Sequence, residues 1–232
     1  SNVEIYNYKH KRIPQVSCGR KPSGVTEIQE NNGYNGDIKK TLYACDKNLK
    51  RINANTCRVL FYHCRFTKIT ESTLNGGAIS ITTSSSLSNG NIEIFYCIFS
   101  ECKGNNGGAI YIHTAQNSRE FCIRYCEFIK NEATSTSGQG GAILADLTLA
   151  FIEHCIFNNN KGVKGRDIYY ECTASAQVSQ ITKQQYLTIK NNTFQNSLSA
   201  GTNCLFYMKW NTKSNMSFIE NQIIIDTSVS DN

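Results

Sequence analysis

The chain has 232 residues, of which 40% are hydrophobic and 18% are charged, and its formal net charge is +6. A hydrophobic fraction of this size is enough for a buried core and excludes a wholly disordered chain. The basic residues are scattered apart from one run at Lys9–Arg12, which is typical of a solvated tail, so we expect no nucleic-acid partner. No segment is long and apolar enough to predict a membrane span within this chain.

The counts of individual residue types favour a turn-rich protein from an oxidising compartment. There are 16 glycines and 26 asparagines against two prolines, and Gly and Asn tolerate the left-handed backbone of tight turns. The 11 cysteines indicate an extracellular or cell-surface location. Their odd number leaves at least one thiol unpaired, unless it bridges to another chain.

The first 50 residues lack the pattern that follows them, and we predict that residues 1–50 form an N-terminal cap. Residues 51–232 are predicted to form one continuous domain of repeats. The strongest signal is a Cys-x-Phe motif that occurs four times and is followed, in the same register, by Asn-x-Phe and Asn-x-Ile. The steps between these motifs are 33, 29, 29, 37 and 29 residues. Their first residues are Cys64, Cys97, Cys126, Cys155, Asn192 and Asn221.

Short alternating apolar runs stand on both sides of the motifs. Ile92-x-Ile94 and Phe121-x-Ile123 precede two of them, and Gly-Gly-Ala-Ile follows at Gly76–Ile79, Gly107–Ile110 and Gly140–Ile143. Two or three short strands in about 30 residues, without a helical period, are typical of one coil of a parallel β-helix. We therefore predict an all-β fold, a single-stranded parallel β-helix of about five to six coils stacked about 4.8 Å apart.

Stacking places equivalent residues above one another, so the six motif positions predict an inward ladder of small, weakly polar side chains. The four cysteines of this ladder could be free buried thiols or could form bridges between adjacent rungs. A second inward stack of core residues is predicted from Phe66, Phe99, Phe128, Phe157 and Phe194. We expect any disulfide to involve cysteines outside this register, namely Cys18, Cys45, Cys57, Cys102, Cys122, Cys172 and Cys204.

The sequence predicts neither a metal site nor a cofactor. Cys97–Cys102 and Cys122–Cys126 are spaced loosely like zinc ligands, but neither has a second Cys or His pair beside it to complete four ligands. The glycine pairs lack both the following Gly-Lys-Ser/Thr and the helix of a phosphate-binding loop.

Candidate catalytic residues lie on the strands that follow the glycine pairs. Parallel β-helix enzymes act on polysaccharides through carboxylates on an outward strand face. If the isoleucines face inward, His113, Asp146 and Glu171 occupy successive rungs of one outward column, about 5 Å apart, which suits general acid and base chemistry. Tyr111 and Tyr169, in the neighbouring outward column, are candidates for stacking on sugar rings. A solvated strand face has the same polar pattern, so the column alone does not establish catalysis.

Gly-Gly-Ala-Ile combined with Phe-x-x-Asn resembles the repeats of the polymorphic outer-membrane protein (Pmp) family. Phe-x-x-Asn occurs at Phe128–Asn131 and Phe157–Asn160, while Phe66–Ile69 and Phe99–Cys102 differ at the last position. The resemblance covers about residues 57–171 well and extends more weakly to about residue 225. It implies a right-handed β-helix of the pectate lyase-like superfold, displayed on a cell surface or secreted, and used in adhesion.

Three functions remain open from the sequence. The first is a non-enzymatic surface or secreted domain that binds a host-cell surface protein or a glycan. The second is a polysaccharide lyase or glycoside hydrolase that uses the His113, Asp146 and Glu171 column. The third is a structural stalk without a ligand. None of the patterns indicates an oligomeric state, and fold analogy does not decide among these functions.

Overall fold

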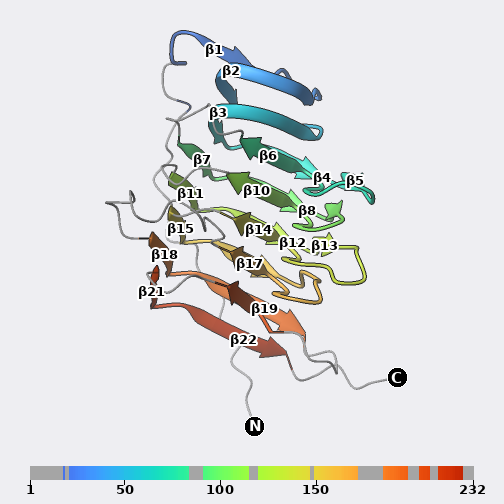
Figure 1. Ribbon diagram of the computed structural model, residues 1–232, viewed down its shortest axis with the longest axis vertical. Coiled ribbons are helices and arrows are strands. Elements are labelled where there is room, and N and C mark those ends of the chain that lie inside the picture. The colour runs from blue at the N-terminus through green and yellow to red at the C-terminus, as the bar shows by residue number, and fades with distance from the viewer. Residues whose placement is uncertain are drawn as a thin grey trace.

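The computed structural model describes residues 18, 21–83, 91–114, 120–146, 149–171, 185–197, 204–209 and 214–226. Within these residues every pairing between strands is parallel and no helix occurs, so the fold is all-β (Figure 1). The strands lie in successive layers, and strands of one layer pair with those of the next. This arrangement is consistent with the predicted parallel β-helix.

The largest sheet has 13 strands in two arms that meet at β3. The first half of β3 pairs with β6 through Ile52 and Ile79, and its second half pairs with β7 through Val59 and Ile92. The sheet starts with β1 (Val25–Glu27), β2 (Tyr34–Cys45) and β3 (Ile52–Tyr62). The first arm continues with β6 (Ile79–Thr83), β10 (Ile110–Thr114), β14 (Ile143–Asp146), β17 (Ile168–Glu171) and β20 (Phe206–Lys209). The second arm consists of β7 (Ile92–Phe95), β11 (Glu120–Arg124), β15 (Leu149–Glu153), β18 (Gln185–Lys190) and β21 (Ser214–Ile219).

Two smaller sheets complete each layer. The six-stranded sheet consists of β4 (Arg65–Thr67), β8 (Ile98–Ser100), β12 (Glu127–Ile129), β16 (Ile156–Asn158), β19 (Thr193–Ser197) and β22 (Gln222–Asp226). The three-stranded sheet consists of β5 (Thr70–Glu71), β9 (Lys103–Gly104) and β13 (Glu132–Ala133). From β6 the chain passes through β7, β8 and β9 before β10 begins the next layer, so one repeat of the sequence makes one layer.

The described part of the predicted cap belongs to this stack. Strand β1 pairs with β2, and β2 pairs with β3 from Tyr34 and Ile52 to Cys45 and Tyr62. A disulfide joins Cys18 to Cys45, two of the cysteines outside the motif register. The described residues before position 51 therefore contribute the first two strands of the stack, on which the later layers lie.

The core is made of residues that repeat at the same inward positions. Five successive strands, from β3 to β17, begin with an isoleucine, and these isoleucines pair with one another between adjacent layers. Each is at most 1% exposed: Ile52, Ile79, Ile110, Ile143 and Ile168. In the six-stranded sheet the five phenylalanines from Phe66 to Phe194 are fully buried. Their adjacent rings are 4.9 Å apart with interplanar angles of 4° to 11°. Burying each ring contributes about 2–3 kcal/mol to stability.

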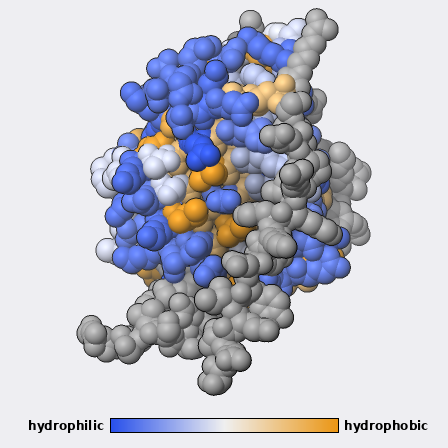
Figure 2. Space-filling view, turned by 180° about the vertical axis from the view of Figure 1, so that it is seen from behind, coloured by the Kyte–Doolittle hydropathy of each residue, from blue (hydrophilic) through white to orange (hydrophobic). Residues whose placement is uncertain are grey.

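The last layer ends the core. Ile223 follows Phe194 in the ring stack, and Phe218 follows Ile189 in the second arm, yet they are 47% and 41% exposed because β22 and β21 are the last strands of their sheet and arm. On the face shown in Figure 2, the described surface is mostly hydrophilic. In Figure 2, which shows the molecule from behind, hydrophobic residues appear as a small group in the middle of that face.

The glycine pairs allow adjacent layers to approach closely at a bend. Gly140 has a φ of +66°, a left-handed conformation that favours glycine. A Cβ atom on Gly141 would lie 2.0 Å from the carbonyl oxygen of Arg166 in the next layer. The first glycine thus provides the turn, and the second leaves room for the neighbouring backbone.

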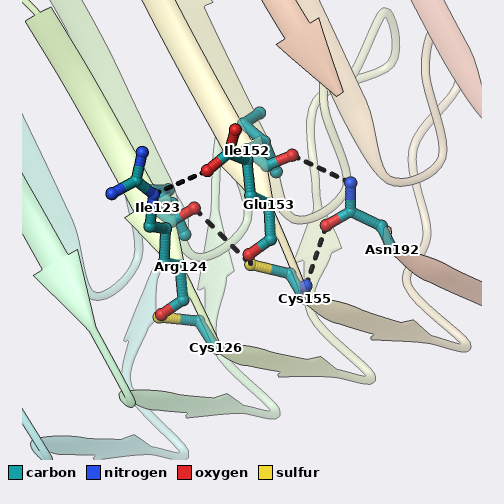
Figure 3. Close-up of polar contacts among 7 residues, drawn as sticks. All are labelled: Ile123, Arg124, Cys126, Ile152, Glu153, Cys155 and Asn192. Carbon is teal, nitrogen blue, oxygen red and sulfur yellow. Dashed lines mark hydrogen bonds and ion pairs between the residues drawn. The ribbon is translucent and has the colours of Figure 1, made fainter. Parts of the chain in front are cut away.

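The ladder that runs from Cys64 to Asn221 satisfies backbone groups between layers. Asn192 shows both of its interactions: Oδ1 accepts the N–H of Cys155 at 2.8 Å, and Nδ2 donates to the carbonyl of Ile152 at 2.9 Å (Figure 3). Asn221 makes the same two bonds one layer further on, to the N–H of Asn192 and the carbonyl of Ile189. Buried backbone groups need such partners, so the asparagine slot is structural.

A buried thiol makes the same pair of contacts. The sulfur of Cys126 accepts the N–H of Cys97 at 3.4 Å, and its thiol faces the carbonyl of Ile94 at 3.3 Å. Cys155 points in the same way toward the carbonyl of Ile123, at 3.8 Å (Figure 3). Burial raises the pKa of Cys126, which keeps the thiol protonated and able to donate.

A second ladder follows the phenylalanine stack and explains Phe-x-x-Asn. Asn131 Nδ2 donates to the carbonyl of Phe99, and Cys102 directs its thiol to the carbonyl of Phe66 at the equivalent position. Cys102 also donates its N–H to Asn131 Oδ1 at 3.0 Å. The departure of Phe99–Cys102 from the motif therefore replaces the amide by a thiol and keeps the architecture.

The cysteines of the ladders are free. The structure gives free, buried thiols at Cys64, Cys97, Cys102, Cys122, Cys126 and Cys155, and a free, exposed thiol at Cys204. The sequence left open whether the cysteines of the main ladder are free thiols or form bridges between adjacent rungs. In the described residues they are free thiols. The side chain of Cys57 and all of Cys172 lie outside the described residues.

We predict that Cys126→Asn keeps most of the stability of the protein, whereas Cys126→Ala lowers the free energy of unfolding by about 1–3 kcal/mol. Asparagine reproduces the donor and acceptor that Asn192 provides elsewhere, while alanine leaves the N–H of Cys97 and the carbonyl of Ile94 without this partner. Urea denaturation measures both values. Equal losses in the two variants would contradict an exchangeable polar rung.

Candidate functional site

The register of the first arm brings the three candidate catalytic residues into one column. His113 of β10 pairs with Asp146 of β14, and Asp146 pairs with Glu171 of β17. Thr82 of β6 precedes them, and Lys209 of β20 follows them. The column thus contains, in order, a hydroxyl, an imidazole, two carboxylates and an ammonium group.

His113 and Asp146 form a hydrogen-bonded pair. Nδ1 of His113 lies 2.9 Å from Oδ2 of Asp146. The side chain of His113 is 44% exposed, while that of Asp146 is only 13% exposed. The hydrogen bond to Asp146 raises the pKa of His113 above its ordinary 6.5, partial burial opposes this, and the charges of Asp146 and Glu171 add to the rise. The pair therefore favours the imidazolium form more than an isolated histidine does.

Both carboxylate oxygens of Glu171 are bound by neighbours. Oε1 accepts a hydrogen bond from Lys209 Nζ at 2.6 Å, and Oε2 accepts one from the Tyr169 hydroxyl at 3.0 Å. Burial raises the pKa of Tyr169, and Glu171 raises it further, so the phenol stays protonated and donates. The sequence pattern does not indicate Lys209, because β20 has no clear glycine pair before it to mark its register.

The two candidate sugar-stacking tyrosines differ in their accessibility. Tyr169 is 3% exposed, and its ring stacks on Tyr207 at 5.0 Å. Leu144, which pairs with Tyr111 and Tyr169 in the same column, is 5% exposed. Tyr111 is half-buried, and burial raises its pKa. This departs from the expectation of an open outward column, since Tyr169 has no exposed ring face for a sugar.

The column therefore has the properties of an interlayer network more than those of an active site. A catalytic acid or base must reach the reacting atoms of a bound polymer within hydrogen-bonding distance. Asp146 is largely buried and bound to His113, and Glu171 has both oxygens occupied. His113 is the most accessible of the three candidates.

A second set of repeated side chains lies outside the core, at the turn between the second arm and the six-stranded sheet. The stacked rings, which we call the turn ladder, are His63, Tyr96, Tyr125 and His154. Adjacent ring centroids are 4.9, 4.9 and 4.8 Å apart, with interplanar angles of 7°, 4° and 13°. Each residue has a φ between +52° and +57°, a conformation uncommon for residues other than Gly, Asn, Asp and His. The same turn position is Asp46 in the layer before and Asn191 and Glu220 in the layers after.

The turn ladder was missed in the sequence analysis, although a signal for it exists. Each of its residues directly precedes a cysteine of the inward ladder, so the pattern is aromatic-Cys-x-Phe in four repeats. The position lies in a turn and holds either His or Tyr. Neither strand alternation nor amino-acid identity therefore singles it out.

A shallow depression lies beside the first end of the turn ladder. It has a volume of about 280 Å³ and crosses three layers. Its lining residues are Asp46, Lys47, Asn48, His63, Arg65, Tyr96 and Ile98. Asp46 and Arg65 are exposed and Lys47 is half-buried, so charged groups of both signs border it.

Among the described residues, one group of three side chains has the spacing of metal ligands: Cys18, Cys45 and Asp46. Two of the three are joined in the disulfide, so their sulfurs are not available as thiolate ligands. The group does not fit a metal site. No helix in the described part of the chain could cross a membrane.

Comparison with protein-family models, with curated proteins and with solved structures gives no match in any of the three.

We predict that Asp146→Asn lowers the pKa of His113 toward 6.5, because it removes the anionic acceptor that is the main cause of the raised value. In the folded wild type the raised pKa adds stability that is fully present below pH 6.5 and is lost as the pH rises through the raised value. NMR titration of the imidazole, assigned with His113→Gln, measures the change. Glu171→Gln is the control and should have a smaller effect, since Glu171 acts on His113 only through its charge. An unchanged pKa in Asp146→Asn would contradict the pairing.

Proposed function

We propose that the protein is a non-enzymatic secreted or cell-surface domain that binds a glycan or a host-cell surface protein. The observation that carries this proposal is the turn ladder. Four aromatic side chains stack on one another outside the hydrophobic core, at a turn position with a positive φ.

The turn ladder has the properties of a binding surface. Because its rings stack on one another, they present their edges to solvent in a strip about 15 Å long. The strip contains two tyrosine hydroxyls and two imidazoles, so each ring combines an apolar body with a polar edge. Aromatic side chains of this kind are enriched at binding interfaces, where they provide contact area at a small entropic cost. The strip suits a partner that is extended along the stacking direction.

The finer description of the fold is part of the same proposal. We infer a right-handed β-helix of about six coils, similar to the repeats of the Pmp family. Support comes from the positions of the two motifs: the glycines lie at the close bend, and Asn131 and Asn160 lie in a buried ladder. The Cys18–Cys45 disulfide supports an oxidising, extracellular environment.

The enzymatic alternative is favoured by one observation, the 2.9 Å hydrogen bond between His113 and Asp146. The burial of Asp146 and the two bonds on Glu171 argue against it. The stalk alternative accounts for the layers but gives no reason for an aromatic strip on the outside of the turns. Binding therefore agrees best with the geometry.

We predict that the wild-type protein binds defined members of a glycan array or a cultured-cell surface and that Tyr125→Ala loses most of this signal. Removing Tyr125 interrupts the turn ladder in its middle, between Tyr96 and His154. Tyr111→Ala is the matched control, a tyrosine of the first arm, and should retain binding. Thermal unfolding of both variants excludes loss of fold as the cause. Equal binding by Tyr125→Ala and wild type would contradict a role of the ladder.

We also predict that the purified protein does not cleave polysaccharides, because its candidate carboxylates are buried or bound. Incubation with acidic and neutral polysaccharides, with assay of new reducing ends and of unsaturated products, measures this. Cleavage that disappears in Asp146→Ala would establish the enzymatic alternative instead.

A further inference from the structure

The turn ladder ends at a layer where the ring is missing. Asp46 occupies the turn position before His63 and has the same backbone conformation, with φ values of 51° and 52°. Its N–H donates to the carbonyl of Tyr62 just as that of His63 donates to the carbonyl of Phe95. Asp46 is thus the equivalent of the ladder residues but has a carboxylate instead of a ring. The depression lies at this place.

The lining of the depression combines three kinds of group. The turn column contributes Asp46 and the rings of His63 and Tyr96. The neighbouring column of the six-stranded sheet contributes Arg65 of β4 and Ile98 of β8, which pair in register. A carboxylate, two aromatic rings and a guanidinium therefore border the same space.

The other two lining residues differ in their freedom to bind a ligand. Asn48 is held by Glu30, which accepts hydrogen bonds from its side chain at 2.7 Å and from its backbone N–H at 2.9 Å. Lys47 adds a second cation next to Arg65. Among the side chains that line the depression, two are positive and one is negative. The carboxylates of Glu27 and Glu30 also act on Lys47, so Arg65 is the cation that favours an anionic group on the ligand.

We propose that this depression is a subsite for a single carboxylated sugar ring, such as a uronic or sialic acid residue of a glycan. The proposal rests on the proposed function and specifies where and how the glycan is held. The sugar ring would take the place that the turn ladder leaves empty at Asp46, with its apolar face toward the rings. Its carboxylate would lie against Arg65 and Lys47, and its hydroxyls would donate to Oδ1 of Asp46, whose Oδ2 lies 3.0 Å from Cys18 Sγ.

The size and chemistry of the depression agree with this ligand class. About 280 Å³ is below the usual range for a drug-sized ligand, roughly 300–1,000 Å³, and admits one ring rather than a folded segment of a partner. Arginine binds carboxylates through paired N–H groups, and an aspartate accepts from hydroxyls. A dianionic phosphate lacks the hydroxyl groups with which a sugar donates to Asp46, and this carboxylate would repel it.

Asp46→Tyr tests the site by filling it with a ring of the protein itself. Tyr96 and Tyr125 occupy this turn position with φ values of 57° and 56°, so a tyrosine fits the backbone of Asp46. Asn191→Tyr is the matched control, since it adds a ring next to His154, at the end of the turn ladder away from the depression. Both variants should fold as the wild type does.

The probes are 3′-sialyllactose against lactose, and a hyaluronan tetrasaccharide against chitotetraose. NMR titration of the backbone amides measures each dissociation constant and maps the shifted residues. We expect at least one carboxylated probe to bind more tightly than its neutral counterpart and to shift the amides of Lys47 and Arg65. Asp46→Tyr should weaken that binding by at least about tenfold, and Asn191→Tyr should change it by less than about twofold.

Arg65→Gln tests the charge. It should weaken the binding of the carboxylated probe by about tenfold and leave the binding of the neutral probe unchanged, because a charge-assisted contact is lost. Raising the salt concentration should also weaken the binding of the carboxylated probe to the wild-type protein. Equal affinities for carboxylated and neutral probes, or unchanged affinity in Asp46→Tyr, would overturn the subsite.

The failure of this inference is distinguishable from failure of the proposed function. If Asp46→Tyr keeps the glycan-array signal that Tyr125→Ala loses, the turn ladder binds and the subsite does not. If no probe binds and neither the glycan array nor the cultured-cell surface gives a signal, both are wrong.

Discussion

The parallel pairing between layers is the constraint on which the rest of the structure depends. It places every side chain about 4.9 Å from its equivalents in the layers on either side, both for buried rings such as Phe66 and Phe99 and for outer rings such as His63 and Tyr96. Like groups are favourable at this spacing only if they are apolar, planar or hydrogen-bonded. One charged column alternates in sign, since Glu132 lies between Lys103 and Lys161 at 2.8 and 2.9 Å.

The same spacing determines how buried polar groups are satisfied. A side chain with one donor and one acceptor bridges its own layer to the preceding one if it reaches both a carbonyl and an N–H of that preceding layer. Asn192 does this with an amide and Cys126 with a thiol. The thiol is the weaker donor but costs less to bury. The mixture of Cys and Asn in one ladder is therefore a choice between two solutions to one requirement.

The sequence was sufficient for the layers and their register but not for the surroundings of the outer columns. Steps of 29 residues fix which side chains stack, so the positions of Phe128 and Cys126 followed from the pattern. The burial of Tyr169 and the bonds on Glu171 did not, because they depend on Lys209 and Tyr207 in a layer whose repeat signal is weak. The turn ladder was missed since its residues lie between the strands, where alternation gives no information.

The buried thiols of the main ladder allow the opening of four layers to be followed by chemical labelling. Cys64, Cys97, Cys126 and Cys155 lie in four successive layers and are at most 1% exposed. A thiol can react with an alkylating reagent only when its own layer opens, and layers of a stacked repeat can open separately from the ends. The order in which the four cysteines become labelled would therefore give the order in which the stack comes apart. The thiols that help to close the core can therefore also report its opening.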